Sequence, residues 1–165
     1  NMFRKMRRKR QALPAAECEK ILERGTSGVL AVAGDGGYPY AVPLSYVYRE
    51  GKIYFHCAKS GHKLDALRRC DKASFCVIDR DEVVPEAFTT YFRSVIAFGR
   101  VRVLQERAEI DGAIDRLARK YCPEAGDGER AAEIEREREI LCVLEMSVEH
   151  MTGKEAIELV QKRNS

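Results

Sequence analysis

The stretch from Phe88 to Leu104 constrains the fold more than any other part of this sequence. It is long, and its β-branched and aromatic residues alternate with other residues, as in a β-strand with two different faces. Gly99 lies inside it, and a glycine within a strand often marks a bulge where the strand bends. A long, bent strand of this kind is typical of an antiparallel barrel, whose strands must curve to close the sheet.

Shorter strand patterns surround this one, and turns separate most of them. We expect further strands over residues 27–33, 38–48, 52–57, 73–79 and 141–148, a hairpin turn at 34–37 and a loop at 81–86. Helical spacing predicts helices over 14–24, 62–70, 108–121 and 127–139, and an amphipathic turn at 154–160. Alternating β-α-β units are absent, which argues against a Rossmann or flavodoxin-like sheet. The predicted fold class is α+β, mainly β with helices: a six-stranded antiparallel split β-barrel.

The size and composition fit one domain over residues 1–165 with an ordinary apolar core. The apolar stretch from Gly28 to Gly34 is far too short to cross a bilayer, and no apolar segment follows the basic N-terminus as a signal peptide requires. The six cysteines lack the close spacing of a zinc site, so we expect no metal and interpret them as reduced, buried thiols of a cytoplasmic protein. They are Cys18, Cys57, Cys70, Cys76, Cys122 and Cys142.

The net charge of +3 is concentrated near the N-terminus. Six of the 29 basic residues lie between Arg4 and Arg10, and in the rest of the chain acidic residues outnumber basic ones. A nucleic-acid-binding protein normally carries its basic surface on the fold, interleaved with aromatic residues. We therefore interpret residues 1–12 as a basic arm that docks on a partner subunit. Contact with nucleic acid or an anionic membrane is the less favoured alternative.

Two segments indicate where a ligand could bind. Pro43 interrupts the small face of the strand predicted over 38–48, so this strand lies at a sheet edge, where it either protects the edge or offers main-chain groups to a flat ring. The second segment, Ala58 to Lys63, joins an apolar strand to a helix. Gly61 allows close backbone approach, and the free amides of the helix start, with His62 and Lys63, favour an anion such as a phosphate over a plain surface turn.

The order of these pieces is more specific than any one of them. Residues 40–46 (YAVPLSY), 53–58 (IYFHCA) and 61–67 (GHKLDAL), followed by Ser94-Val95 and Gly99, together resemble the Nim-type, nitroimidazole-resistance-like branch of the pyridoxamine-phosphate-oxidase-like split barrels. The resemblance covers residues 7 to 150. It implies a split barrel that dimerises and holds FMN at the subunit interface.

The resemblance also implies a role for particular residues. The main chain from Val42 to Tyr46, which includes Pro43, Leu44 and Ser45, would flank the isoalloxazine ring. Further residues would line the ring, bind the phosphate or close the site from the neighbouring strand: Phe55, His56 and Ala58; Gly61, His62 and Lys63; Ser94 and Val95. His62-Lys63 stands where true pyridoxamine-phosphate oxidases carry an Arg-Lys pair, and their C-terminal Arg and His pattern is missing, so oxidation of pyridoxamine phosphate is not expected.

We therefore predict a homodimeric, FMN-binding oxidoreductase that reduces a small nitroaromatic or quinone-like acceptor, with no nucleic-acid or membrane partner. His56 is the candidate catalytic residue, as a donor to the ring or a proton source for the product, although a strand histidine can also be a satisfied core residue. His150 is expected at the surface without a partner. The charged helix at 127–139 is expected to be solvated, or else to form a lid over the flavin. A non-catalytic flavin-binding module and a haem-binding barrel with His56 or His62 as iron ligand are the alternatives.

Overall fold

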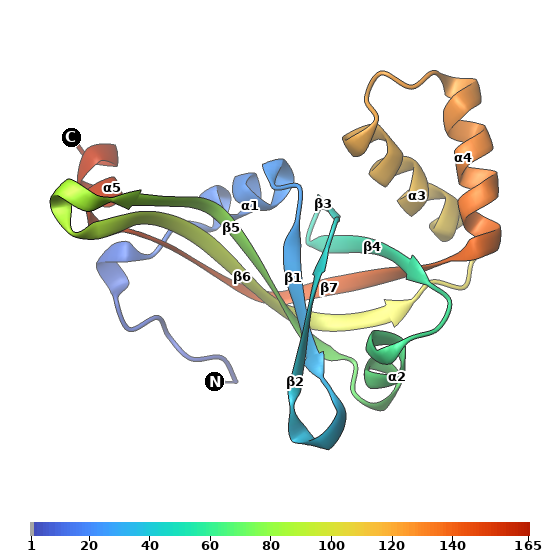
Figure 1. Cartoon of the computed structure of the whole chain (residues 1–165), viewed down its shortest axis with the longest axis horizontal. Coiled ribbons are helices and arrows are strands. Elements are labelled where there is room, and N and C mark those ends of the chain that lie inside the picture. Colours follow the sequence, from blue (N-terminus) through green and yellow to red (C-terminus); the bar gives the residue numbers. More distant parts are fainter. Residues whose placement is uncertain (1) are drawn as a thin grey trace.

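The computed structural model describes residues 2–165, so the first residue of the expected arm lies outside it. Seven antiparallel strands form one sheet in the order β2-β1-β5-β6-β7-β4-β3, with α3 and α4 at one end of the molecule and α5 at the other (Figure 1). The predicted α+β split barrel is confirmed, with one strand more than expected. The strands are β1 (Gly28–Ala33), β2 (Pro39–Leu44), β3 (Val47–Arg49), β4 (Lys52–Ala58), β5 (Lys72–Val84), β6 (Thr89–Val103) and β7 (Leu141–Glu155), and the helices are α1 (Ala15–Arg24), α2 (His62–Arg69), α3 (Arg107–Tyr121), α4 (Asp127–Ile140) and α5 (Ile157–Arg163).

The extra strand arises because the segment predicted as one strand over 38–48 is divided. β2 pairs with β1 at one edge of the sheet, whereas β3 pairs with β4 at the opposite edge. Ser45 and Tyr46 connect the two strands, and we call these two residues the crossover. The chain therefore passes from one sheet edge to the other at this point, which closes the barrel without a continuous hydrogen-bonded ladder.

Alternation along the strands builds the core on one face of the sheet. Leu30, Phe75 and Ala97 lie opposite one another on β1, β5 and β6, and all three are fully buried. The Phe75 ring meets Tyr46 and Phe55 edge-on, at centroid distances of 4.9 and 5.1 Å. These pairs lie in the preferred range for edge-to-face aromatic contacts, so they anchor the crossover to the centre of the core.

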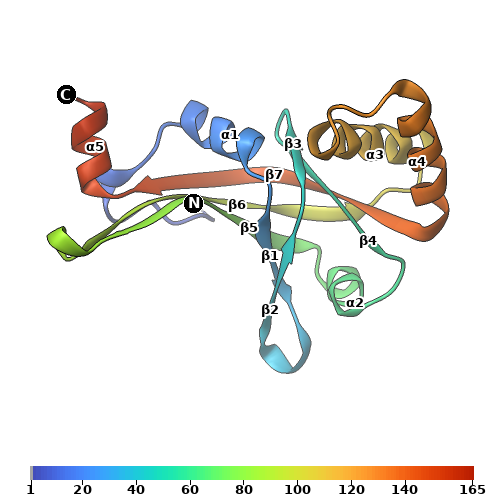
Figure 2. The same cartoon turned by 45° about the horizontal axis from the view of Figure 1, so that its top comes forward.

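Three strands extend well beyond the barrel. β5, β6 and β7 continue together as a ribbon that carries α5 near its end (Figures 1 and 2). The loop predicted at 81–86 is therefore wrong, because β5 runs to Val84 in register with β6. The last strand also runs past the expected end at residue 148, so Lys154 and Glu155 belong to β7 and not to a C-terminal turn. The bulge predicted at Gly99 is confirmed, since the β6–β7 register shifts between Phe98 and Gly99.

The N-terminal arm lies partly on its own chain. Gln11 is buried, and Ala12 forms a β-bridge with Lys154. Phe3 stacks on His150, with a centroid distance of 4.7 Å and an angle of 8° between the rings. The expectation that His150 has no partner is therefore wrong.

The six cysteines are all free thiols, but they differ in burial. Cys18 and Cys57 are buried, whereas Cys122, directly after α3, is exposed and so departs from the prediction of a buried thiol. Within residues 2–165, no three His, Cys, Asp or Glu side chains come together as a metal site. In the same part of the chain, every helix is too short or too polar to span a bilayer.

Candidate flavin site

The crossover is held in place by the last turn of α3. The Tyr46 amide donates to the Tyr121 hydroxyl at 2.9 Å, and that hydroxyl donates to the carbonyl oxygen of Thr26. The Lys120 ammonium donates to the carbonyl oxygens of Tyr46, at 3.0 Å, and Gly25, and it lies 4.0 Å from the centre of the Tyr46 ring. Burial lowers the pKa of Lys120 to about 8. The main chain expected to flank a flat ring is therefore rigid, and the residues that fix it were not predicted.

The start of α2 has the features of an anion site. Gly61 precedes the helix with φ of 146°, no side chain caps the first turn, and a Cβ at this glycine would meet no atom within 4 Å. The first amides of an α-helix lack intrahelical partners and carry the positive end of its dipole. Half-buried Lys63 lies beside the Cys57 thiol, where its charge opposes the effect of burial on the pKa of that thiol. Open space, uncapped amides and a neighbouring ammonium group fit a phosphate.

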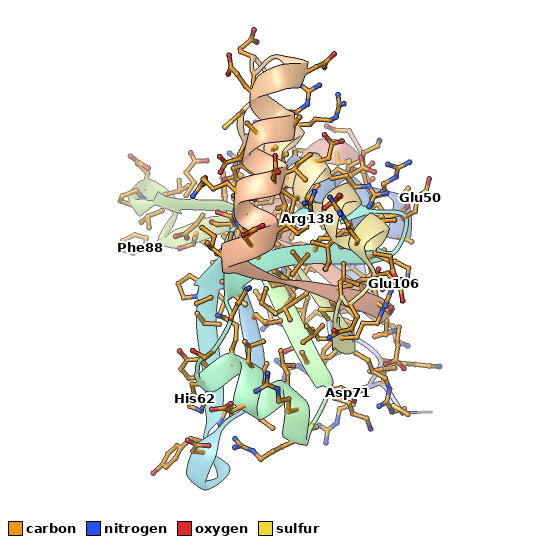
Figure 3. All side chains as sticks on the ribbon, turned by 90° about the vertical axis from the view of Figure 1, so that its right-hand side faces the viewer. Glu50, His62, Asp71, Phe88, Glu106 and Arg138 are labelled. Carbon is orange, nitrogen blue, oxygen red and sulfur yellow. The ribbon has the colours of Figure 1, made fainter. Side chains whose placement is uncertain are left out.

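The His62 side chain lies at the start of α2, against the ring of Tyr40. Its imidazole lies 4.1 Å from the Tyr40 ring, and its Nε2 atom is buried without a hydrogen bond among the described residues. Asp35 Oδ2 lies 3.7 Å from this atom, and Arg69 binds the other carboxylate oxygen, Oδ1, at 2.7 Å. Figure 3 shows His62 at the start of α2, close to the β1–β2 hairpin. The Gly61–Lys63 segment, which we call the α2 cradle, thus gathers three predicted residues.

His56 opens into a separate pocket of about 390 Å³ between β4 and the helices α3 and α4. Ser45 of the crossover lies on the same pocket wall, so the structure brings two predicted residues together here. From the sequence, the helix at 127–139 is expected in solvent or over the flavin. Its Glu137 lies with Oε1 3.6 Å from His56 Nδ1. The spacing of Glu129, Glu133 and Glu137, four residues apart on one helix face, was the signal that could have indicated this pocket.

Pro43 lies at the edge of the sheet, as predicted, and begins an apolar row across its outer face. The register aligns Pro43, Val29, Cys76 and Ile96 on β2, β1, β5 and β6. Val29 and Ile96 are 39% and 38% exposed. The Ala41 and Pro43 side chains point outward with this row, whereas Tyr40, Val42 and Leu44 turn inward against the core. The small face of β2 therefore continues into an exposed apolar surface.

Some of the remaining predicted residues are buried, and others lie far from His56. Phe55, Tyr46 and Val95 are fully buried, so only their main chain or neighbours can reach a ligand, while Ala58 is exposed. Val95 pairs with Gly153 on β7, whereas His56 pairs with Val143 on the same strand. Ten residues of β7 span about 33 Å at a rise of about 3.3 Å per residue. Within one chain, Ser94 and Val95 are therefore far from His56.

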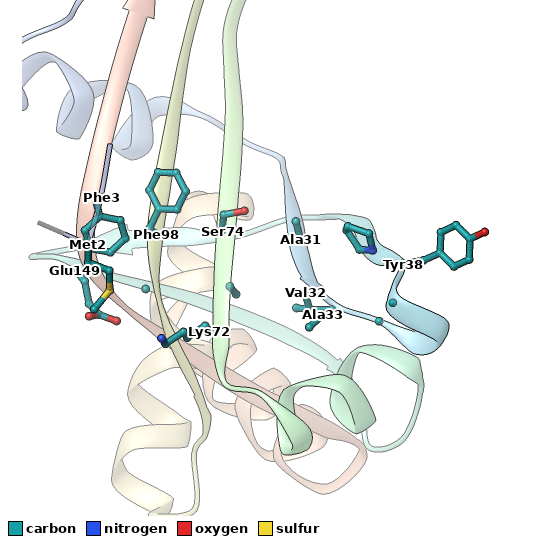
Figure 4. A pocket seen from close by; sticks show the side chains of 15 residues that line it. Met2, Phe3, Ala31, Val32, Ala33, Tyr38, Lys72, Ser74, Phe98 and Glu149 are labelled. Carbon is teal, nitrogen blue, oxygen red and sulfur yellow. The ribbon is translucent and has the colours of Figure 1, made fainter. Parts of the chain in front are cut away.

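A further hollow, of about 550 Å³, lies on the outer face where the arm crosses it. Figure 4 shows Phe3 beside Phe98 at one side and Tyr38 at the other, with Ala31 and Ser74 between them. Its lining is mainly apolar and small. It is larger than the His56 pocket, but it gathers none of the predicted site residues.

Comparison with known proteins identifies the fold. A crystal structure of a protein from Mycobacterium tuberculosis of unassigned function superposes with a TM-score of 0.80 at 17% identity, covering 98% of this chain and 94% of that one. A proposed 5-nitroimidazole antibiotic resistance protein from Bacteroides thetaiotaomicron superposes with a TM-score of 0.72 at 21% identity, covering 87% and 85%. An FAD-binding protein from Mesorhizobium loti is 27% identical, with a TM-score of 0.63 and coverage of 88% and 97%.

The amino-acid sequence also supports this fold. No curated protein sequence matches the chain. The family model for pyridoxamine 5'-phosphate oxidase, however, matches residues 14–155, which include all seven strands and both candidate sites. The match leaves out only the basic arm and the C-terminal helix. The resemblance derived from the order of the motifs is thereby confirmed, and this chain belongs to the pyridoxamine 5'-phosphate oxidase-like family of split barrels.

Proposed function

We propose that this protein is an FMN-dependent oxidoreductase that acts as a homodimer and reduces a small nitroaromatic or quinone-like acceptor. The α2 cradle is the observation that carries the proposal. In a chain of this family, uncapped helix amides beside the Lys63 ammonium group suit the terminal phosphate of FMN. When bound, FMN would supply the redox chemistry, since flavins pass on hydrides or single electrons. The protein would supply orientation.

Different residues of the site would bind different parts of the cofactor. Lys63, His62 and the amides after Gly61 would hold the phosphate. The rigid main chain of the crossover, with Pro43 and Leu44 before it, would lie along the ring, and His56 would border the ring side. None of these groups is a nucleophile paired with a base, which favours chemistry carried by the cofactor.

The distance between His56 and the Ser94-Val95 pair supports the dimer. If both contribute to one flavin site, a second copy must bring its own Ser94 and Val95 to the first copy's His56. The exposed row that contains Val29 and Ile96 offers an apolar surface for this contact. The six free thiols favour a reducing compartment, and we place the protein in the cytoplasm.

The visible absorption spectrum of the purified full-length chain, followed by release of the chromophore, tests the cofactor. We expect two flavin bands and FMN at about one per chain. An intense Soret band would instead indicate haem bound through His56 or His62. A colourless protein that does not bind added FMN would contradict the proposal.

Substitution of Lys63 tests the cradle. Lys63→Ala should weaken FMN binding roughly tenfold to hundredfold, because a hydrogen bond to a charged group is worth about 1.5–3 kcal/mol. Binding of riboflavin, which lacks the phosphate, should stay unchanged. Lys59→Ala removes an exposed ammonium from the same loop and is the matched control. Equal FMN affinities for the two variants would show that the phosphate lies elsewhere.

Turnover separates an enzyme from a passive flavin-binding module. The holoprotein should oxidise NADH or NADPH steadily only when a nitroaromatic or quinone acceptor is added. Flavin binding without any acceptor-dependent oxidation would favour the module.

A further inference from the structure

The pocket beside His56 is enclosed by three separate parts of the chain. β4 and the crossover form one wall, the end of α3 a second, and one face of α4 the third. Its volume of about 390 Å³ lies within the usual size range of small-molecule sites. Because Ser45 and His56 also belong to the residues assigned to the flavin, the pocket adjoins the proposed cofactor. The lining residues are Ser45, His56, Leu117, Ala118, Tyr121, Cys122, Ala125, Glu129, Arg130, Glu133 and Glu137.

His56 and Glu137 face each other within this pocket. The His56 Nδ1 atom is buried and has no hydrogen-bond partner in the described chain, and Glu137 Oε1 lies 3.6 Å from it. Only 13% of the Glu137 side chain is exposed. A small rotation would bring the two groups into hydrogen-bond distance. Glu137 lies in the last turn of α4, where the negative end of the helix dipole favours a proton on either group.

Burial shifts the pKa values of both His56 and Glu137. Burial lowers the pKa of His56, against the opposing charge of Glu133. Burial, followed by repulsion from Glu133, raises the pKa of Glu137. These shifts come from burial and from Glu133, so the pairing of His56 with Glu137 rests on their geometry, with Oε1 3.6 Å from Nδ1.

The charges around the pair leave the pocket acidic. From α4 it receives Glu129, Glu133 and Glu137, and Glu133 also binds Arg136. The lining cation Arg130 is already paired with Asp115 and Asp127. The other two walls contribute only neutral groups: Ser45, Tyr121 and Cys122. A neutral or cationic ligand is therefore favoured here over a carboxylate or a phosphate.

We propose that this pocket is the acceptor site of the proposed reductase, that it takes small neutral or cationic aromatic acceptors, and that His56 and Glu137 act there as an acid–base pair. The inference rests on the proposed function, since the acceptor needs a reduced flavin beside it. His56 is the catalytic residue of the pair and Glu137 the positioning residue.

Reduction of the acceptor consumes a proton, and supplying this proton is the role of His56 and Glu137. Reduction of a quinone to a hydroquinone takes up one hydride and one proton, and reduction of a nitro group to a nitroso group takes up the same and releases water. A bound reduced flavin would supply the hydride. His56 would give the proton from its Nε2 atom while Glu137 passes one to Nδ1; afterwards Nδ1 would return that proton to Glu137 and Nε2 would take one from solvent.

An NMR titration tests the pair without any turnover. The C–H signals of the three histidine rings in the full-length chain are followed against pH, with and without FMN, and His56→Gln identifies the signal of His56. Glu137→Gln keeps the shape of the side chain but removes its charge, so the apparent pKa of His56 should fall by about one unit. Glu135→Gln removes an exposed charge from the same helix and should leave it unchanged. Equal titration of His56 in both variants would overturn the pair.

A charge series of nitroaromatics tests the pocket. For 4-nitrobenzylamine and 4-nitrobenzyl alcohol, kcat/KM should exceed that for 4-nitrobenzoate at least tenfold, and Glu137→Gln should reduce this preference while lowering kcat. Faster reduction of the anion would overturn the acceptor assignment. If the protein binds no flavin, the proposed function is wrong. The NMR titration then still shows whether His56 and Glu137 form a pair.

Discussion

The two faces of the strands β1, β5 and β6 differ in burial although both carry large apolar residues. On the inner face, Leu30, Phe75 and Ala97 have no exposed surface. On the outer face, their sequence neighbours Val29 and Ile96 are more than one-third exposed, and Ile78 is 67% exposed. An antiparallel sheet with one solvated face normally alternates apolar with polar residues. Val29, Ile78 and Ile96 depart from that alternation, whereas other outward positions such as Ser74 and Ser94 follow it.

The difference indicates which surface a single chain completes by itself. The inner face is closed by α1 and the crossover, so its residues stabilise the fold. The outer face is covered only in part, where Phe3 packs against Phe98 and His150. Because an exposed apolar surface of this kind marks an interaction site, we expect substitutions inside to change folding and substitutions outside to change assembly. Three experiments probe this contrast.

The largest effect is expected on the inner face. Phe75→Ala should lower the free energy of unfolding by about 3–5 kcal/mol, since it leaves a cavity and removes the edge-on contacts with Tyr46 and Phe55. Urea unfolding followed by circular dichroism measures the loss. Because Tyr46 belongs to the crossover, FMN binding should weaken as well. A loss below about 1 kcal/mol would mean that the core does not depend on this ring.

A substitution on the outer face should change the assembly of the protein rather than its folding. Ile96→Asp places a charge in the centre of the exposed row, where an interface would have to bury it unpaired, so the dimer should dissociate. Light scattering gives the mass, and circular dichroism checks that the chain remains folded. Ile140→Asp makes the same change at a position that is 52% exposed at the end of α4 and should leave the mass unchanged. An Ile96→Asp protein that stays dimeric would place the interface on another surface.

The smallest effect concerns a polar link between the two faces. Asp79 lies at the irregularity of β5 and accepts hydrogen bonds from Arg24 of α1, at 2.7 Å, and Arg93 of β6, at 3.1 Å. These guanidinium groups hold the pKa of Asp79 below its ordinary value of 3.8. The stability it contributes is therefore complete above pH 3.8 and is lost as pH falls through the lower value in the folded state.

Unfolding measured between pH 7 and pH 2.5 tests this link. Asp79→Asn should cost roughly 1–2 kcal/mol at pH 7 and should flatten the acid end of the stability curve. Asp65→Asn, which removes a carboxylate exposed on α2, is the control and should keep the acid dependence. An Asp79→Asn protein with an unchanged acid dependence would assign the acid sensitivity to other carboxylates.

The pattern within short windows was sufficient for most elements and for the α2 cradle. Gly61-His62-Lys63 identified a helix start with cationic neighbours, because capping and the helix dipole act over one turn. Pro43 identified an edge strand, because proline lacks the donor that an inner strand needs. The division of residues 38–48 left no such signal, since the alternation of Tyr40, Val42 and Leu44 continues unbroken into Tyr46 and Tyr48.

The spacing of the glutamates on α4 marked the helix face that lines the His56 pocket, but the contact between His56 and Glu137 was beyond what the sequence could predict. Glu137 follows His56 by many residues, and they meet only because β4 pairs with the strand that follows α4. The sequence analysis therefore treated α4 as a solvated helix or a lid. Cys122 illustrates the same limit, since an apolar-looking cysteine lies at an exposed helix end where no neighbouring element covers it.

By itself, the sequence determined most of the strands and helices, the bulge at Gly99 and the family, because periodicity, turn residues and motif order depend on neighbours along the chain. Only the tertiary structure decided that Ser45 and Tyr46 carry the chain between opposite sheet edges, that the ribbon extends beyond the barrel, and that His56 faces Glu137. The physical reason is that these features depend on which distant segments pair. That choice is made by burying apolar area over the whole domain rather than by any local preference.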